Sequence, residues 1–598
     1  MEFEQKAEEK KMSMSKNIAR LAVTAGLTAA LSFGGVMAPV TMAFAEGATT
    51  SDNSITITQN KDNESTTFKA YQIFKADVVD PTEAGATDKI VSNVKWADGV
   101  DPDAQNAIIE AIKKDSKYTT SDSKPNIVTA QDVADWLAEN VTDTTAEPVV
   151  NKDHLLNKIA AIVKKNVEAT GNSFSAGDSF TVPKDDKNSP KTGYYLFLTD
   201  ESSLSTSEVA KKNTGTSPIF AVVGGKAVTV VEKTGIPTVT KKVKDDKPDS
   251  DWKDKADSQM GQDVHYQLTG TVADNVATFG TYYYEFHDKL SAGLTANADS
   301  VNVTVYADDS DTQGTEIELP ADAVSYNPDG INTLLTVKFD NLKAVTAKVT
   351  NAPVEITASS KVVVTYTASL DPSKTVTVGD EGNPNSVKLI YSNNPMGDGK
   401  GESVADTVRD YTYALRLVKE DAANDVNKLD GVKFTIQATN PDDNAEGAPA
   451  GAKYVQENGT LSENKYEFET KNGGVIEVKG LDAGTYTVKE THTLDGYNTL
   501  PDFTFRIWTA DGDLAKPEGE DNNKLTVKVT RDASSLVKDA TVTDGVVNLT
   551  VQNKKGSGLP LTGLNGVTFT WIAGGAVLCI GVAHLIRSRK QAEESERE

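Results

Sequence analysis

Apolar and polar residues alternate in short runs along the middle and C-terminal parts of this 598-residue chain. Successive side chains of a strand point to opposite faces of a sheet, so such runs predict strands that bury one face. Turn residues, such as those at 327–330, separate the runs. Short strands at this spacing predict immunoglobulin-like β-sandwich domains in series. The clearest runs lie at 264–268, 301–306, 334–339, 362–367, 413–419, 432–436, 475–478, 485–490 and 547–553.

The region from about residue 46 to residue 234 mixes strand and helix patterns. Residues 54–58, 68–74, 194–198 and 227–231 read as strands. Between residues 104 and 170 the apolar residues return with a helical period, in groups such as Ile108, Ile109, Ile112 and then Val133, Trp136, Leu137 and Leu155, Ile159, Ile162. Thr129 and Asp132 have the spacing of a capping box. The chain is therefore predicted to be mostly β, with some helix in its N-terminal domain.

The C-terminus combines three features in a fixed order. A pentapeptide, Leu559, Pro560, Leu561, Thr562 and Gly563, precedes an apolar run at 567–586. The run is long enough to cross a hydrocarbon core as a helix, and the basic residues after it favour a cytoplasmic end. This order resembles the cell-wall sorting signal of Gram-positive surface proteins. There, a sortase cleaves between the residues that match Thr562 and Gly563 and passes the new acyl end to an amine. The alternative is an ordinary single-span anchor behind a chance pentapeptide.

The N-terminus has the features of an export signal. Lys16 and Arg20 precede an apolar stretch at 21–40, and small residues at 43 and 45 form a cleavage site. The charged residues before Met12 add nothing to this signal, which leaves Met12 and Met14 as alternative starts. We expect a secreted protein that is covalently anchored to the cell wall, with a mature chain from about residue 46 to residue 562.

Composition narrows the possible functions. The formal charge of −26 argues against nucleic acid as a partner. The single cysteine, Cys579, lies in the predicted span, so the mature chain has no disulfide. We expect no cofactor and no metal. The patterns divide the chain into a signal at 1–45, an N-terminal domain at 46–236, a middle domain at 237–409, a C-terminal domain at 410–555 and a sorting signal at 556–598.

Three strands of the C-terminal domain each carry one polar residue on an otherwise apolar face. Every second residue of a strand lies on the same face. Counted in this way, the apolar rows that begin at Tyr413, Tyr486 and Val547 lead to Lys419, Glu490 and Asn553, respectively. Strand ends that reach solvent would explain each residue singly. A lysine, a carboxyl and an amide buried together suggest a reaction, because burial lowers the pKa of the amine and raises the pKa of the acid. The amine attacks the amide carbon, the acid shuttles protons, and ammonia leaves. The product is an internal isopeptide bond between the first and last strands, promoted by rigid placement.

This domain resembles the collagen-adhesin B-type domain of pilins. The family signature is Glu-Thr-x-Ala-Pro-x-Gly-Tyr, and residues 490–497 have the same spacing, with Thr493 and Leu494 in place of Ala and Pro. The resemblance assigns Glu490 as the acid that promotes the bond. The substitutions affect the loop and leave the carboxyl in place.

In the middle domain, counting every second residue of a strand also places polar residues on apolar faces. Lys241 shares a face with Val239 and Val243, and Asn385 begins the row of Val387 and Leu389. Asn393 continues that count and competes with Asn385, although it lies beyond the strand. Residues 286–294 resemble the segment that carries the catalytic aspartate of fimbrial isopeptide-forming domains, which implies Asp288. The cluster of His287, Asp288 and Ser291 lacks the nucleophile elbow of a hydrolase.

The segment 228–234 resembles the strand and acceptor lysine of backbone pilins, with Lys233 eight positions before Lys241 and Val231-Glu232 in place of Tyr-Pro. A solvated lysine at a domain junction is the alternative. The whole pattern resembles a Gram-positive, sortase-assembled major (backbone) pilin. It implies a structural subunit and no enzyme, apart from its self-promoted crosslinks. Implied partners are pilin-specific and housekeeping sortases, identical subunits, minor or tip pilins, and peptidoglycan. A monomeric wall-anchored adhesin for a host ligand is the alternative function.

Overall fold

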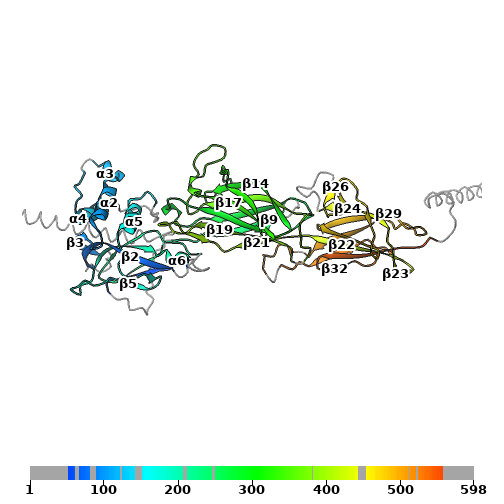
Figure 1. Ribbon diagram of the computed structural model, residues 1–598, viewed down its shortest axis with the longest axis horizontal. Helices are drawn as coiled ribbons and strands as arrows, with labels where there is room; N and C mark the ends of the chain where they lie inside the picture. Colours follow the sequence, from blue (N-terminus) through cyan, green and yellow to red (C-terminus); the bar gives the residue numbers. More distant parts are fainter. Residues whose placement is uncertain are drawn as a thin grey trace, which may run out of the picture.

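The computed structural model forms an extended rod in which three bodies follow one another in chain order (Figure 1). Strands dominate the second and third bodies, and the first combines strands and helices in similar amounts, so the prediction of a mostly β, sandwich-type protein with some helix in its N-terminal domain is confirmed. The structure describes residues 52–60, 63, 66–80, 89–121, 124–141, 151–205, 212–232, 234–244, 250–379, 381–441, 453–510, 512–519 and 523–556. The predicted export signal, Lys233, the pentapeptide at 559–563 and the predicted span therefore lie outside the described residues. Among the described residues, none of the helices is long and apolar enough to cross a membrane.

The first body packs two small sheets against each other and helices against the larger one. One sheet has the order β5-β1-β8, and the other has the order β3-β2-β6-β7 with β4 at one end of β2. The strands are β1 (Ser54–Thr58), β2 (Thr67–Val79), β3 (Ile90–Trp96), β4 (Phe174–Ser175), β5 (Ser179–Thr181), β6 (Gly193–Thr199), β7 (Ile219–Val223) and β8 (Val228–Val231). The helices are α2 (Pro102–Lys113), α3 (Ser116–Thr119), α4 (Ala130–Asn140), α5 (Leu155–Asn166) and α6 (Ser202–Ser205).

The helices form where the periodicity predicts them. Thr129 and Asp132 make the expected capping box at the start of α4, since each side chain accepts from the backbone N–H of the other residue. Asp101 caps α2, and Pro102 occupies a first-turn position that needs no N–H. The apolar faces of α2, α4 and α5 pack against β2, β6 and β7 in one continuous core, and a second core lies between the two sheets.

The second body is a sandwich of two mainly antiparallel sheets. Their orders are β10-β9-β12-β18-β14-β15 and β11-β21-β19-β13-β17-β16, with β20 paired to β19. The bounds are β9 (Val239–Lys244), β10 (Trp252–Lys253), β11 (Lys255–Asp257), β12 (Val264–Thr271), β13 (Tyr284–Leu290), β14 (Leu294–Tyr306), β15 (Thr315–Glu316), β16 (Val324–Asp329), β17 (Asn332–Phe339), β18 (Lys361–Leu370), β19 (Asn383–Ser392), β20 (Lys400–Glu402) and β21 (Asp406–Tyr411), with 3-10 turns η2 (Val276–Thr278) and η3 (Leu342–Ala344).

The second body departs from the sequence prediction in two places. The turn predicted at 327–330 is shorter, because β16 continues through Asp329 and the chain reverses at Gly330, whose φ of 64° favours glycine. Asn385 does not lie on the last strand, because β20 and β21 follow β19. A Lys241–Asn385 crosslink would therefore join β9 of one sheet to β19 of the other.

The third body is a second sandwich, and its first and last long strands are neighbours. β22 and β33 pair in parallel within the sheet β23-β22-β33-β32, which β28 joins at β22. The other sheet has the order β26-β25-β24-β29-β30-β31, with β27 paired to β24. The bounds are β22 (Tyr413–Asp421), β23 (Asn424–Lys428), β24 (Lys433–Pro441), β25 (Tyr454–Val455), β26 (Leu461–Ser462), β27 (Phe468–Glu469), β28 (Val475–Leu481), β29 (Gly484–His492), β30 (Phe503–Thr509), β31 (Val527–Arg531), β32 (Thr541–Thr543) and β33 (Val546–Asn553).

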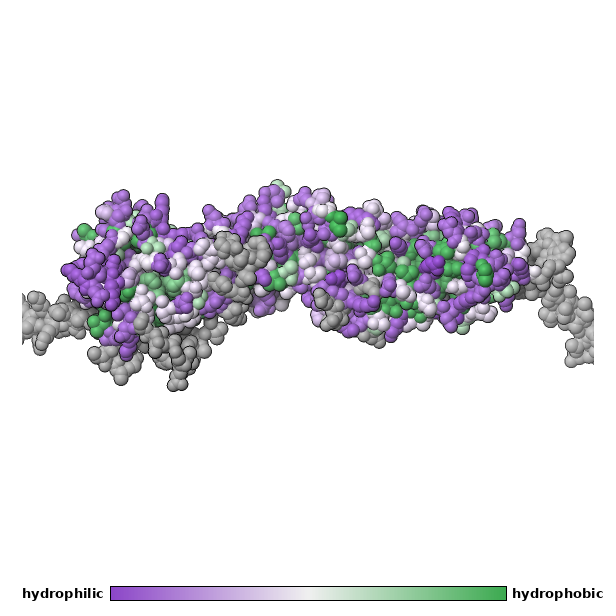
Figure 2. All heavy atoms as spheres, turned by 60° about the horizontal axis from the view of Figure 1, so that its bottom comes forward, coloured by the Kyte–Doolittle hydropathy of each residue, from purple (hydrophilic) through white to green (hydrophobic). Residues whose placement is uncertain are grey.

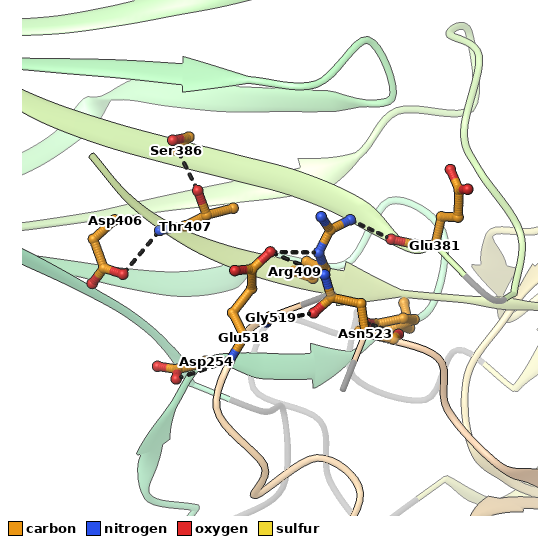
Figure 3. A network of polar contacts seen from close by, with 10 residues as sticks. Asp254, Glu381, Ser386, Asp406, Thr407, Arg409, Glu518, Gly519 and Asn523 are labelled. Carbon is orange, nitrogen blue, oxygen red and sulfur yellow. Dashed lines mark hydrogen bonds and ion pairs between the residues drawn. The ribbon is translucent and has the colours of Figure 1, made fainter. Parts of the chain in front are cut away.

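Polar contacts fasten the second body to the third. Arg409 on β21 donates from Nε to Glu518 Oε1 (3.1 Å) and from Nη1 to the carbonyl of Glu381 (2.7 Å), as Figure 3 shows. The backbone N–H of Glu518 in turn donates to Asp254 Oδ2 (3.3 Å). The loop around Glu518 thus reaches from the third body onto β21 and the segment beside β10.

Polar residues cover most of the face shown in Figure 2, and apolar residues reach that surface in scattered groups, mainly toward the C-terminal half. The large apolar side chains that are most exposed, Val349, Ile331 and Val426, lie in turns or on a short edge strand. Scattered exposed apolar residues of this kind are usual on soluble surfaces.

Candidate isopeptide sites

In the third body the structure brings Lys419, Glu490 and Asn553 together. Lys419 Nζ donates to Glu490 Oε2 (2.8 Å) and to Asn553 Oδ1 (2.5 Å). Asn553 Nδ2 donates to the other carboxylate oxygen, Glu490 Oε1 (2.8 Å). The two oxygens of one acid therefore contact both the amine and the amide. The alternating pattern of β22, β29 and β33 directs all three side chains inward, as counting every second residue predicts.

Burial tunes the chemistry of this site. The side chains of Lys419 and Glu490 are fully buried, and Lys419 Nζ lies 5.3 Å from the centre of the Phe434 ring. Burial lowers the pKa of Lys419 to about 8, against the opposing pull of the Glu490 charge. An amine with this pKa reaches its neutral, nucleophilic form more easily than an exposed lysine does.

Thr493 adds a contact that the sequence did not predict. Its hydroxyl accepts a second hydrogen bond from Asn553 Nδ2 (2.7 Å). In the sequence, the only signal for this contact is that Thr493 departs from the family signature. Thr493 is half-buried, whereas Asn553 is fully buried.

In the middle body the structure also collects the predicted residues, in a different arrangement. Lys241 on β9 donates to Asp288 Oδ1 on β13, and both side chains are buried. Asn385 on β19 is fully buried and donates from Nδ2 to the hydroxyl of Tyr366 (2.7 Å). Its Oδ1 has no hydrogen-bond partner among the described residues. Tyr366 links Asn385 to the acid, because its hydroxyl donates to Asp288 Oδ2 (2.6 Å).

Two stacked tyrosines form the wall of this site. Lys241 Nζ lies 5.4 Å from the ring centre of Tyr266 and 5.5 Å from that of Tyr366. Burial lowers the pKa of Lys241 to about 8, while Asp288 acts in the opposite direction. The sequence pattern does not single out Tyr366. It continues the buried row of Val362 and Val364, and an aromatic residue in such a row normally reads as core.

The rival residues lie elsewhere. Asn393 follows the end of β19 and donates to the carbonyl of Asn213 in the first body (3.1 Å). Lys242 points away from Lys241 and pairs with Asp254. His287 contacts Glu285 (3.1 Å) on the opposite face of β13 from Asp288. His287 and Asp288 therefore do not form the polar pair of a hydrolase.

The chain around the predicted acceptor lysine is anchored. Glu232 is buried, and its carboxylate accepts from the backbone N–H of Asn60 (2.9 Å) and from the hydroxyl of Thr66 (3.1 Å). Burial raises the pKa of Glu232. Thr234 is also buried and donates from Oγ1 to the carbonyl of Thr214 (3.2 Å). Lys233 itself lies outside the described residues.

In the described part of the first body, the most deeply buried lysine is Lys89. It donates to the carboxylate of Asp80 (2.9 Å) and to two backbone carbonyls, and not to an Asn or Gln side chain. Within the described ranges, no cluster of three or more His, Cys, Asp or Glu side chains could hold a metal ion.

Comparisons with known proteins agree with the sandwich architecture. Residues 414–541 match the family described as SpaA: Prealbumin-like fold domain. The comparison with curated proteins gave no match.

Among solved structures, the chain is similar to the T6 backbone pilin of serotype M6 Streptococcus pyogenes (16% identity, 85% of this chain, 100% of that one, TM-score 0.46). It is also similar to the major pilin SpaA of Corynebacterium diphtheriae (12%, 84%, 100%, TM-score 0.38). A third similar structure is the full-length major pilin SpaD of that species (14%, 84%, 97%, TM-score 0.36). The family model thus assigns a prealbumin-like fold to residues 414–541, which belong to the third body.

Proposed function

We propose that this protein is the structural backbone subunit of a covalently polymerised pilus on a Gram-positive cell. A sortase joins Thr562 of one subunit to Lys233 of the next, and a housekeeping sortase links the fibre to peptidoglycan. The mature subunit has an N-terminal domain (46–236), a middle domain (237–409) and a C-terminal domain (410–555), followed by the sorting signal. The last two domains are each closed by an internal Lys–Asn isopeptide bond.

The observation that carries this proposal is the pair of buried lysine, acid and amide sites. Burying a lysine and a carboxylate costs several kcal/mol per ion, so two such sites in successive domains would be an expensive way to stabilise a fold. The cost is removed if each site reacts, because the product amide is neutral. The lowered pKa of Lys419 and Lys241, together with the close approach of each acid, supports this chemistry.

Polymerisation is supported by the order of the C-terminal features and by the position of Lys233. The pentapeptide at 559–563 precedes an apolar run and a basic end, as a sortase substrate requires. Lys233 stands between two anchored residues, Glu232 and Thr234, at the junction of the first two domains.

The test is a denaturing gel of cell-wall extracts. The wild-type subunit, expressed with its sortases, should give a ladder of high-mass species, and Lys233→Ala should reduce this ladder to monomer that still reaches the wall through Thr562. Lys226→Ala and Lys242→Ala are matched controls that should keep the ladder. A ladder that persists in Lys233→Ala and vanishes in either control would overturn the choice of acceptor. Wild-type protein that stays monomeric would overturn the polymer and favour a wall-anchored adhesin.

A further inference from the structure

The two candidate isopeptide sites use acids of different length, and the difference changes what each acid can reach. Glu490 contacts the amine with one oxygen and the amide nitrogen with the other (2.8 Å each). Asp288 is one methylene shorter. Its Oδ1 accepts from Lys241, whereas its Oδ2 accepts from Tyr366 instead of the amide. The middle domain therefore needs another group between the acid and Asn385.

Tyr366 occupies that position. Its hydroxyl accepts from Asn385 Nδ2 (2.7 Å) and from Lys241 Nζ (3.1 Å), and it donates to Asp288 Oδ2 (2.6 Å). One phenol oxygen thus contacts all three members of the site. The ring is held by stacking on Tyr266, with centroids 5.3 Å apart and planes inclined by 13°. The side chain is buried on β18, between β12 and β14, so the hydroxyl has little freedom to leave the site.

We propose that Tyr366 is a catalytic residue of the middle domain, which relays a proton from Asp288 to the departing amide nitrogen of Asn385. This inference rests on the proposed isopeptide chemistry. Nothing of the kind is needed in the C-terminal domain, where Glu490 reaches the amide directly. Asp288 and Tyr366 together thus take the role that Glu490 has alone in the C-terminal domain.

Lys241 first gives a proton to the Tyr366 oxygen as Tyr366 gives its own proton to Asp288 Oδ2, which leaves a neutral amine, a neutral phenol and an acid protonated on Oδ2. Nζ attacks Cγ of Asn385, and the new C–N bond forms as the carbonyl electrons move to Oδ1. Asp288 then donates from Oδ2 to the Tyr366 oxygen, Tyr366 donates its own proton to Nδ2, and Nζ returns a proton to Oδ1 of Asp288. The carbonyl re-forms, the Cγ–Nδ2 bond breaks, and ammonia leaves with both the acid and the phenol regenerated.

The surroundings of Tyr366 favour a phenol that stays neutral while it passes protons on. Burial, reinforced by the Asp288 charge, raises the pKa of Tyr366 well above its ordinary value, so the hydroxyl stays protonated and able to donate. Positioned general acids contribute about 10²–10⁴-fold to a rate. Replacing Tyr366 by Phe keeps the stacked ring and removes only the relay.

The experiment follows bond formation in the full mature chain after expression, by intact mass and by the crosslinked peptide that contains Lys241 and Asn385. Tyr366→Phe should form this bond at least about 100-fold more slowly than wild type. The Lys419–Asn553 bond in the same molecules should form normally and serves as the internal reference. Tyr284→Phe removes another buried hydroxyl of the same core, which donates to the carbonyl of Thr271 (2.6 Å), and should leave both bonds intact.

A double variant separates the relay from packing. Asp288→Glu in the Tyr366→Phe background supplies an acid as long as Glu490 and should accelerate the bond relative to Tyr366→Phe alone. Wild-type speed in Tyr366→Phe, or no acceleration in the double variant, would overturn the relay. Failure of the wild-type chain and of Tyr284→Phe to form the middle bond at all would instead overturn the isopeptide proposal beneath it.

Discussion

At the scale of single residues, the proposed chemistry depends on two fully buried lysines, Lys241 and Lys419, each beside a buried acid. A fully buried ammonium is costly, and the structure offsets that cost with one carboxylate and the faces of aromatic rings. Both lysines have a pKa lowered to about 8 by burial. The buried charges of an unreacted site therefore carry a desolvation cost, which formation of a neutral amide would remove.

A pH effect follows for a chain that cannot react. Asn553→Ala leaves Lys419 beside Glu490 with an unreacted amine, whose folded-state pKa of about 8 lies below its ordinary 10.5. The unfolded chain then binds the proton more tightly, so the free energy of unfolding should rise between about pH 8 and pH 10.5 and stay level below pH 8. The gain should reach up to about 3 kcal/mol.

Pulse proteolysis of the C-terminal domain in urea, at pH 7 and pH 10, measures this gain. Asn553→Ala combined with Lys419→Met is the matched control, because it lacks the amine and keeps the other titrating groups. Equal pH dependence in the two variants would show that Lys419 does not titrate in this range.

At the scale of strands, the alternation of side chains between the two faces predicts which polar residues point into the core. Lys419, Glu490 and Asn553 were placed on inward faces by counting along three runs, and the structure places them there because the period of a strand leaves no other choice. Counting could not show that β22 and β33 are parallel neighbours or that β9 and β19 belong to different sheets, since pairing is set by tertiary packing. Counting also could not single out Tyr366, because a buried aromatic residue in an apolar row normally reads as core.

The crosslinks should stabilise each sandwich by closing a long loop. Each would connect residues more than 100 positions apart, which by loop-closure entropy is worth roughly 4–5 kcal/mol per bond. Lys241→Met and Lys419→Met remove the amine, leave an apolar stem, and should each lower the unfolding free energy of their own domain by about that amount. Thermal unfolding and tryptic half-life measure the loss. Both quantities unchanged in the two variants would contradict the presence of the bonds.

At the scale of the whole molecule, the bonds would shorten the path of a pulling force along the rod of Figure 1. In the C-terminal domain the load would pass through residues 410–419, across the crosslink to Asn553 and out of the domain, and so bypass residues 420–552. In the middle domain it would enter near Val239 on β9 and leave through β21. The junctions between domains would then be the parts that yield.

Gln259 makes several hydrogen bonds across the junction of the last two domains. Its Nε2 donates to the carbonyls of Gly459 (2.5 Å) and Gly480 (2.7 Å), and its Oε1 accepts from the N–H of Asp482 (3.2 Å). Gln259→Ala should loosen this joint, seen as a broader distribution of particle lengths in small-angle X-ray scattering, while both crosslinks still form. Gln267→Ala, a change on the half-buried side of β12, is the control and should leave the distribution unchanged. An unaltered distribution in Gln259→Ala would mean that the remaining contacts suffice to hold the joint.

The intact mass of the mature chain shows most directly whether the two sites react. Each bond expels one ammonia, so the purified wild-type chain should be lighter than its sequence by two ammonias. Glu490→Ala and Asp288→Ala should each regain one, and the combination should regain both. Peptide mapping should then join the Lys241 peptide to that of Asn385, and the Lys419 peptide to that of Asn553. A folded wild-type chain with the full mass of its sequence would contradict the central claim.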